Sequence, residues 1–256
     1  MDGVLWKDEN PLANLKRIFE ILAEHKIEYS FATNNSTKTP EEYQKKLGNF
    51  GILSNPDQII TSSTTLIKIM QEKYPNGCPV FLIGENGLRE ALSKAGFSFD
   101  EKEAKAVVGG MDRQVNYEKF KKAILLLQKD VDFYFTNTDT SFPTPLGIIP
   151  GAGSILRTLE VGSGRKAITA GKPKPQMFEK AMDYMGTDSN NTLVIGDRLE
   201  TDILGGLNAN CPTALVLSGI STYADIEKFN IHPHLVHNNL PELIQFLEES
   251  NWEISL

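Results

Sequence analysis

The sequence has 256 residues, of which 40% are hydrophobic and 23% charged, the balance of an ordinary globular protein. Its formal net charge of −7 argues against a surface for nucleic acid or for an anionic membrane, so we expect neither as a partner. The two widely separated cysteines, Cys78 and Cys211, fit no disulfide or metal pattern. With no visible signal peptide or membrane-length apolar run, we expect a cytoplasmic protein.

The first third of the chain alternates helix and strand patterns. Pro11 suits the first position of a helix whose apolar residues recur on one face as far as Leu22. A strand is predicted over 29–33, followed by a helix that opens at Thr39-Pro40. The next elements are a short strand over 58–61 and a helix over about 63–74.

The alternation continues after Gly77 to the end of the chain. A long loop rich in Thr, Pro and Gly is predicted over 137–153. Helices separate further strands, which are predicted near 80–83, 106–109, 132–136, 166–169, 192–196, 213–217 and 235–236. Because repeated strand–helix alternation requires crossover connections, the pattern predicts a parallel sheet in an α/β fold.

One stretch, Thr192–Asp202, joins a strand pattern to two carboxylates. Its apolar run ends in glycine and is followed by Asp197 and, five residues later, by Asp202. Such runs form buried parallel strands, whose carboxyl ends carry the ligand site of open α/β sheets. Acids beside a core need compensation, and Mg²⁺ prefers oxygen ligands. The alternative is structural: Asp197 caps a helix beginning near Leu199, and Asp202 is a solvated acid in its first turn.

Three further motifs lie at the ends of predicted elements: Asp2-Gly-Val-Leu-Trp6, Thr33-Asn-Asn-Ser-Thr37 and Gly171-Lys-Pro173. The carboxyl ends of parallel strands share one edge, so a hydroxyl, a lysine and several carboxylates are expected to converge. That set suits phosphoryl transfer, because a metal and a lysine neutralise charge while hydroxyl and backbone N–H groups hold phosphate oxygens. Each motif also has a structural alternative: a frayed terminus for the first, a turn for the second and a solvated loop for the third.

In that order, the three motifs and Gly-Asp-Arg-Leu-Glu-Thr-Asp-Ile resemble those of the haloacid dehalogenase (HAD) superfamily of phosphatases. The resemblance covers essentially the whole chain and is to the para-nitrophenylphosphatase branch, which includes pyridoxal phosphate phosphatase, phosphoglycolate phosphatase and NagD. It implies a Rossmann-like parallel-sheet core interrupted by an inserted α/β cap. We therefore expect a HAD-like core over 1–77 and 168–256 and a cap over 78–167.

The resemblance also implies roles for the matched residues and Mg²⁺ as the cofactor. Thr33 would bind phosphate oxygens with the help of the backbone around Asn34 and Asn35. Lys172 would offset negative charge on the nucleophile and on the phosphoryl group. The metal would be ligated by Asp197 and supported by Asp202.

The match breaks at the first motif, which is Asp-x-Asp in the family. Asp2 matches its second Asp, which would protonate the leaving alcohol, then activate water, and touch the metal through its carbonyl oxygen. The first Asp, the nucleophile, would precede Met1, and the strand before it would be missing. That absence would leave neighbouring strand edges unpaired and open an apolar slot through the core. We favour a chain start placed too late, so we expect the chain as given to be inactive.

Two functional classes follow. The first is a Mg²⁺-dependent phosphatase that hydrolyses small phosphorylated metabolites through an aspartyl-phosphate intermediate. The second is a non-catalytic protein that binds such metabolites with Thr33, Lys172 and Asp197. A nicotinamide dehydrogenase is disfavoured, because no Gly-x-Gly-x-x-Gly opens a helix after a strand.

Substrate choice is expected to depend on the cap loop over 137–153, which carries Asn137, Asp139 and Phe142. Its Asn137-Thr-Asp139 and Pro150-Gly-Ala-Gly153 segments resemble cap signatures of the family. The loop has no Lys or Arg, which disfavours a second strongly anionic group on the substrate. The alternative is that its prolines only stiffen a surface loop. The oligomeric state stays open, although related enzymes often form homodimers through the cap.

Overall fold

The computed structural model describes residues 1–144 and 147–253, so the 145–146 part of the predicted cap loop lies outside the described residues. The chain divides into two compact units. The first unit comprises Met1–Ala32, Gln44–Ile59 and Lys172–Leu256, and the second comprises Thr33–Tyr43 and Ile60–Gly171. The division into a core and a cap at 78–167 stays a prediction.

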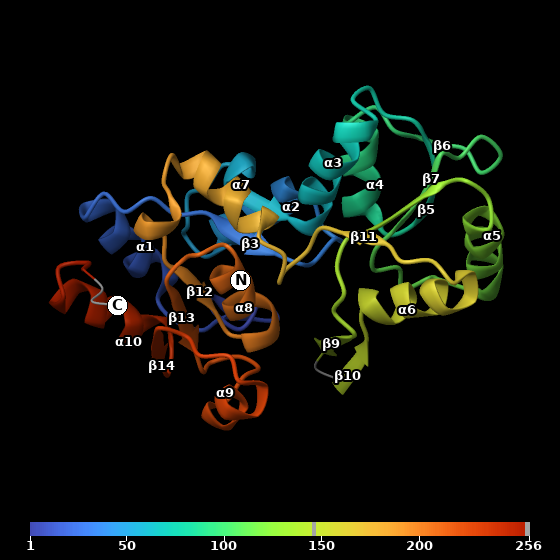
Figure 1. Ribbon diagram of the computed structural model, residues 1–256. Coiled ribbons are helices and arrows are strands. Elements are labelled where there is room, and N and C mark those ends of the chain that lie inside the picture. The colour runs from blue at the N-terminus through green and yellow to red at the C-terminus, as the bar shows by residue number, and fades with distance from the viewer. Residues whose placement is uncertain (145–146, 254–256) are drawn as a thin grey trace. The chain divides into compact units, whose positions relative to one another are not determined.

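A three-stranded parallel sheet lies in the first unit, in the order β12 (Val194–Gly196), β13 (Thr213–Val216) and β14 (Leu235–His237). These three strands confirm the strands predicted near 192–196, 213–217 and 235–236. The surrounding helical segments are α1 (Leu15–Glu24), η1 (Pro56–Gln58), α7 (Gln176–Met185), η2 (Ser189–Asn191), η3 (Leu199–Ile203), α8 (Leu204–Asn208), α9 (Tyr223–Phe229) and α10 (Leu240–Glu249) (Figure 1).

Two hydrophobic clusters pack around β12 and the turn that follows it. On one face, Val194 clusters with Phe178 of α7 and with Cys211. The π-helical turn η3 that follows β12 buries Leu199 and Ile203 against Leu215 of β13. These apolar contacts fix the chain on both sides of the residue that follows Gly196.

Strand β3 (Phe31–Thr33) pairs with β4 (Ile59–Thr61) in a two-stranded sheet that is separate from β12, β13 and β14. Residues of β3 and β12 line a cavity of about 860 Å³ in the first unit. Its walls include consecutive residues from Lys26 to Ala32 and from Asn190 to Ile195. The parallel sheet predicted for the core is therefore divided at this cavity.

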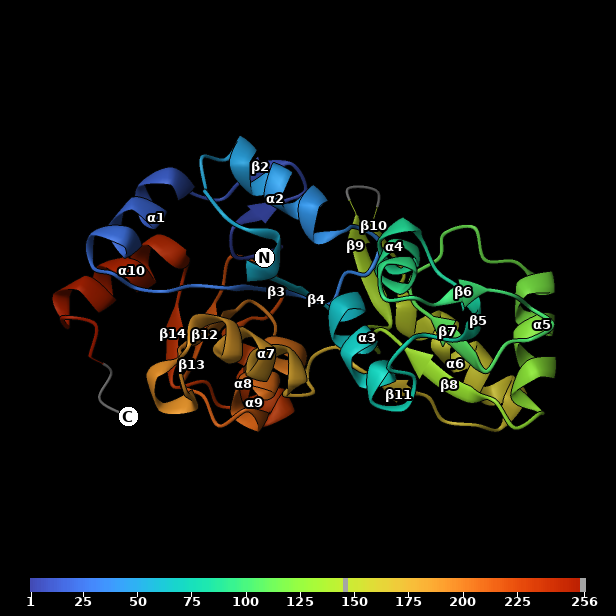
Figure 2. The ribbon, with the colours of Figure 1, turned by 90° about the horizontal axis from the view of Figure 1, so that it is seen from above.

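The second unit is built on a five-stranded sheet in the order β11-β8-β7-β5-β6, in which every neighbouring pair is parallel. Figure 2 shows β6, β5, β7 and β8 in succession. The strands are β5 (Pro79–Ile83), β6 (Ser98–Phe99), β7 (Ala106–Gly109), β8 (Asp132–Phe135) and β11 (Ile168–Thr169). The helices are α3 (Ser62–Lys73), α4 (Asn86–Lys94), α5 (Tyr117–Leu127) and α6 (Ala152–Ser163), with α2 (Pro40–Asn49) crossing the division between units.

Alternating side chains of this sheet enter two hydrophobic layers. On β7, Val107 packs with residues of α5 and α6, whereas Ala106 and Val108 pack with residues of α3 and α4. Figure 1 shows these two helix pairs on opposite faces of the sheet. Continuous apolar runs such as Val80–Ile83 predict strands of this kind, because both faces of a parallel sheet are covered by helices.

The start of the first helix differs from the prediction. Helix α1 begins at Leu15, where the side chain of Asn14 accepts a hydrogen bond from the Arg17 N–H group. Pro11 instead belongs to β2 (Asn10–Pro11), which pairs antiparallel with β1 (Trp6–Lys7). Asn14 is therefore the effective cap, because its side chain satisfies an N–H group that lacks a partner at a helix start.

The long loop predicted over 137–153 contains a hairpin. Strand β9 (Ser141–Thr144) pairs antiparallel with β10 (Gly147–Pro150), and the register sets Phe142 opposite Ile149. Gly153 then lies in the first turn of α6, where an added Cβ would overlap the Thr138 carbonyl group. The two short strands were not predicted, because the Thr, Pro and Gly residues of this segment favour turns.

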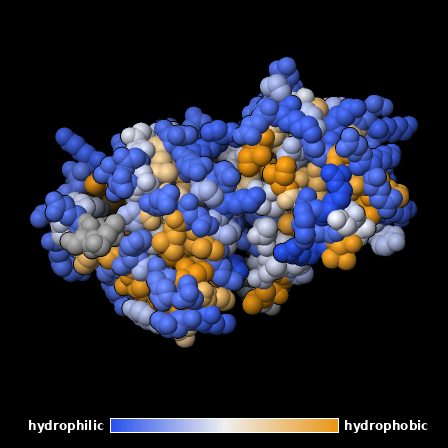
Figure 3. All heavy atoms as spheres, in the orientation of Figure 1, coloured by the Kyte–Doolittle hydropathy of each residue, from blue (hydrophilic) through white to orange (hydrophobic). Residues whose placement is uncertain are grey.

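The surface in Figure 3 is mainly hydrophilic, with scattered hydrophobic side chains. Across residues 1–144 and 147–253, no helix has the length and apolar character needed to cross a bilayer.

Candidate active site

Three buried ionisable side chains gather at the carboxyl end of β12. Asp197 follows the strand directly, Asp202 lies in η3, and Lys172 precedes α7. Each side chain belongs to a residue with less than a tenth of its surface exposed. Lys172 and Asp202 form an ion pair, with 2.5 Å between Nζ and Oδ1. Isolated charges are unstable at such depth, so this pairing compensates part of the desolvation.

Asp202 is held as an anion from two sides. Its Oδ1 accepts a hydrogen bond from Lys172, and its Oδ2 accepts one from the Arg198 N–H group at 3.2 Å. Burial opposes ionisation, but the positive charge and hydrogen bond of Lys172 outweigh it and lower the pKa of the Asp202 carboxyl. The predicted alternative of a solvated first-turn acid does not describe this buried side chain.

Asp197 is less well compensated. Its Oδ2 accepts a hydrogen bond from the Ile220 N–H group at 3.0 Å, and its carbonyl oxygen accepts one from Ser221. Burial and then the negative charge of Asp202 raise the pKa of the Asp197 carboxyl to about 6. Asp197 and Asp202 together therefore carry more negative charge at neutral pH than Lys172 alone can balance.

Two glycines pack against the Asp197 carboxylate. A Cβ added to Gly219 or to Gly3 would overlap its carboxylate group, so neither position has room for a side chain. Ser218 Oγ also donates a 2.6 Å hydrogen bond to the Gly3 carbonyl oxygen, which ties the first motif to the loop after β13. These contacts fix where Asp197 can lie.

Asp2 is exposed, although it lies next to Gly3. Its Oδ1 accepts a 2.9 Å hydrogen bond from the indole N–H group of the fully buried Trp6. This hydrogen bond anchors Asp2, which disfavours the alternative of a frayed terminus. Its role in acid–base chemistry stays a prediction.

The donor chemistry of Asp197 and Asp202 fits Mg²⁺, because a cation would relieve the two buried carboxylates that share one lysine. Among the described residues, no group of three or more His, Cys, Asp or Glu side chains is arranged to hold a metal. Mg²⁺ commonly uses one or two protein carboxylates and completes its shell with water and substrate oxygens. Two acidic side chains therefore suffice, and the assignment of Mg²⁺ stays a prediction.

Thr33 begins a compact turn in the second unit. Its Oγ accepts a hydrogen bond from the Asn35 N–H group at 3.2 Å. Asn35 Oδ1 in turn accepts hydrogen bonds from the N–H and hydroxyl groups of Thr37 at 2.9 and 2.8 Å. These are the local bonds of a polar turn, so the structural alternative and a phosphate-binding role are both compatible with the geometry.

Asn34 connects this turn to the predicted specificity residues. Its side-chain amide donates to both carboxylate oxygens of Asp139 at 3.2 and 3.1 Å, and its carbonyl oxygen accepts from Asn137 at 2.8 Å. Ser62 donates a further 2.6 Å hydrogen bond to the same carbonyl oxygen. Asn34, Asn137 and Asp139 thus form one network, while Phe142 is exposed on β9.

The predicted residues accordingly gather in two groups, each within its own unit. The motifs did not predict the loop after β13, in which Gly219 and Ile220 contact Asp197 and Ser218 bonds to Gly3. A signal was available, because Ser218-Gly219 follows the apolar run of β13 just as Asp197 follows that of β12. The carboxyl ends of parallel neighbours share an edge.

Comparison with known proteins agrees with this arrangement. Residues 1–98 match the model of the haloacid dehalogenase-like hydrolases, and residues 169–243 match that of the HAD-hydrolase-like proteins. The chain is 34% identical over 250 residues to an acid sugar phosphatase of Staphylococcus epidermidis, covering 97% of this chain and 96% of that protein.

Solved structures give the same result. A p-nitrophenyl phosphatase from Archaeoglobus fulgidus superimposes with a TM-score of 0.90 at 31% identity, covering 96% of each chain. NagD from Escherichia coli K-12 superimposes with a TM-score of 0.84 at 27% identity, covering 93% of this chain and 94% of NagD. The predicted α/β fold and the predicted phosphatase branch are confirmed.

Replacing Gly219 by Ala should displace the Asp197 carboxylate and break its hydrogen bond with Ile220. We expect the free energy of unfolding to fall by about 1–3 kcal/mol, the scale of a buried polar group that loses its partner. Gly48→Ala is the matched control, because a Cβ there meets nothing within 4 Å. Urea titration followed by circular dichroism measures both, and equal stability of the two variants would contradict this packing.

Proposed function

The chain belongs to the haloacid dehalogenase-like hydrolase family as a phosphoric monoester hydrolase, and on that premise we propose that it dephosphorylates small metabolites with Mg²⁺ as cofactor. The observation that carries the proposal is the buried cluster of Asp197, Asp202 and Lys172 at the carboxyl end of β12. The names of the relatives, acid sugar phosphatase and p-nitrophenyl phosphatase, support a substrate of this class. The free thiols of Cys78 and Cys211 support a cytoplasmic location.

In this proposal each residue of the cluster acts through the charge of its side chain. Lys172 and Asp202 form a fixed pair, so that the ammonium group is held in place before a phosphate ester arrives. Asp197 offers a carboxylate whose position is set by Ile220 and by two glycines. Bound Mg²⁺ would neutralise phosphate oxygens and so allow a carboxylate to approach the phosphorus atom.

Transfer would proceed in two displacements through an aspartyl-phosphate. A carboxylate placed immediately before Met1 would attack phosphorus, and Asp2 would protonate the departing alcohol. Asp2 would then take a proton from water, which attacks the phosphorus and releases inorganic phosphate. Thr33, with the backbone around Asn34 and Asn35, would bind the phosphate oxygens in this scheme. A homodimer through residues 78–167 remains a further prediction.

A polypeptide of residues 1–256 alone should not turn over para-nitrophenyl phosphate, because it carries no carboxylate at the nucleophile position. An extension that ends in Asp immediately before Met1 should give Mg²⁺-dependent release of nitrophenol, whereas the same extension ending in Asn should not. Equal turnover by the unextended chain, purified free of other phosphatases, would refute these roles. Substrate binding without turnover by the Asp-ended chain would favour the non-catalytic alternative.

In that Asp-ended chain, Asp197→Asn should lower kcat/KM by about 100-fold or more through weaker metal binding, with partial rescue at high Mg²⁺. Lys172→Ala should be similarly severe, because negative charge on the phosphoryl group is then unbalanced. The matched controls are Asp130→Asn and Lys129→Ala, both at exposed positions. Near-normal turnover in both cluster variants would show that the chemistry occurs elsewhere.

Phe142→Ala should change which ester is used without changing stability, because Phe142 is 41% exposed on β9. We expect relative kcat/KM values among phosphate esters to change by about 10-fold, the scale of ~1–2 kcal/mol of lost contact with the leaving group. Profiling a panel of esters, with melting temperatures measured alongside, tests this. An unchanged ranking would remove Phe142 from the specificity determinants, and an unfolded variant would place it in the packing of its unit.

A further inference from the structure

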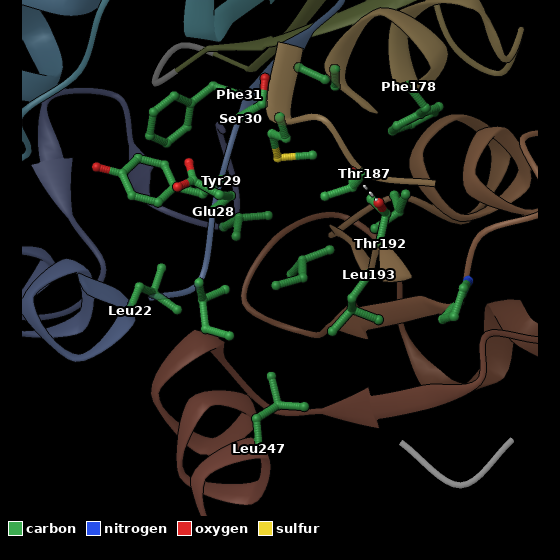
Figure 4. A pocket seen from close by; sticks show the side chains of 18 of the residues that line it. Leu22, Glu28, Tyr29, Ser30, Phe31, Phe178, Thr187, Thr192, Leu193 and Leu247 are labelled. Atoms are coloured by element: carbon green, nitrogen blue, oxygen red, sulfur yellow. Dashed lines mark hydrogen bonds between the residues drawn. The ribbon is translucent and has the colours of Figure 1, made fainter. Parts of the chain in front are cut away.

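A tight turn leads from Asp2 into the β1–β2 hairpin and fixes the main chain beside Asp2. The Gly3 N–H group donates a 2.8 Å hydrogen bond to the Trp6 carbonyl oxygen, and Gly3 has the positive φ of 76° that such a turn requires. Val4 and Leu5, inside the turn, are buried and line the cavity shown in Figure 4. The backbone here is held by its own contacts, whereas the side chain of Asp2 is exposed.

The indole of Trp6 sets the orientation of that exposed side chain. Its N–H group donates a 2.9 Å hydrogen bond to Asp2 Oδ1, and the Trp6 side chain is fully buried. An exposed carboxyl group ordinarily samples several rotamers, but an indole has a single N–H donor and this one cannot follow a moving partner. The hydrogen bond therefore selects one orientation of the Asp2 carboxyl group.

The indole is in turn held by residues at the end of α2. Lys46 Nζ lies over the Trp6 ring, 4.7 Å from its centroid, and the Phe50 ring packs against the indole at 5.6 Å between centroids. A cation over an indole face is an attractive contact. Lys46 Nζ also donates a 2.6 Å hydrogen bond to the Asp8 carbonyl oxygen in the turn between β1 and β2. Lys46 thus binds the hairpin turn and the indole together.

We propose that Trp6 and Lys46 are positioning residues for Asp2: the indole N–H group aims the carboxyl group, and the ammonium group holds the indole. This role rests on the proposed function, in which Asp2 protonates the departing alcohol. With Oδ1 accepting from the indole, Oδ2 is the oxygen that carries the proton to the alcohol. A general acid must lie within hydrogen-bonding reach of the leaving oxygen, so loss of orientation slows proton transfer.

The kinetic test compares two esters in the Asp-ended chain, because only a poor leaving group needs the proton. Trp6→Phe should lower kcat/KM for glycerol phosphate by about 10-fold, and Lys46→Met by about 3-fold. The same variants should change kcat/KM for para-nitrophenyl phosphate by less than about 2-fold, because nitrophenolate leaves as a stable anion. Lys45→Met is the matched control at an exposed position of α2 and should alter neither value.

A second measurement reports the contact itself without any need for turnover. The chain has two tryptophans, so its NMR spectrum holds two indole N–H signals, and Trp252→Phe identifies which belongs to Trp6. Asp2→Ala in the chain of residues 1–256 should move the Trp6 indole proton signal upfield, because its hydrogen bond to a carboxylate is lost. The Trp252 signal should stay in place, and Asp130→Ala, at an exposed position, should move neither.

Different results overturn different parts of the account. Equal losses on both esters in Trp6→Phe, or no loss on either, would overturn the positioning role. An unmoved Trp6 signal in Asp2→Ala would overturn the hydrogen bond on which that role depends. An Asp-ended parent that turns over neither ester would refute the proposed function, and with it any catalytic part for Asp2. If circular dichroism shows Trp6→Phe to be unfolded, Lys46→Met decides alone, and an unchanged ratio between its two kcat/KM values would overturn the proposal.

Discussion

The buried ion pair between Lys172 and Asp202 is the interaction on which the first unit's chemistry depends. Its Nζ–Oδ1 distance of 2.5 Å joins a residue before α7 to one in η3, 30 positions later in the chain. Removing either partner would leave a charge buried without compensation, which is strongly destabilising. The pair therefore fixes a positive charge near Asp197, as the proposed phosphate site requires.

The packing around Asp197 constrains its carboxylate. Gly3 and Gly219 leave no room for it to move toward them, and Ile220 holds one of its oxygens. Burial and the neighbouring Asp202 raise the pKa of Asp197, and a cation bound there, as proposed, would stabilise the ionised form.

Much of the fold could be predicted from the sequence, because buried parallel strands such as β7 and β12 are continuous apolar runs. The start of α1 could not, since Pro11 and Asn14 both suit a helix start and only the pairing of β2 with β1 decides between them. The β9–β10 hairpin could not be predicted either, because its turn-forming residues indicate a loop.

The candidate site, too, could be predicted from the sequence only in part. Motif order identified Lys172, Asp197 and Asp202, because each adjoins a strand end or a helix start. The strand ends place Gly219 and Asp197 at one edge of the sheet, but their close contact depends on tertiary structure, since a glycine has no side chain to mark its role. The pairing of Lys172 with Asp202, rather than with Asp197, likewise depends on tertiary structure.

The most direct test of the central claim is paramagnetic broadening by Mn²⁺, used in place of Mg²⁺, in amide NMR spectra of the chain. The account predicts that the amide signals of Gly3, Arg198 and Ile220 broaden at low Mn²⁺ in the wild type and in Asp130→Asn, and that this selective broadening is lost in Asp197→Asn. Selective broadening of the same signals in Asp197→Asn, or its absence from the wild type, would contradict a cation site at Asp197.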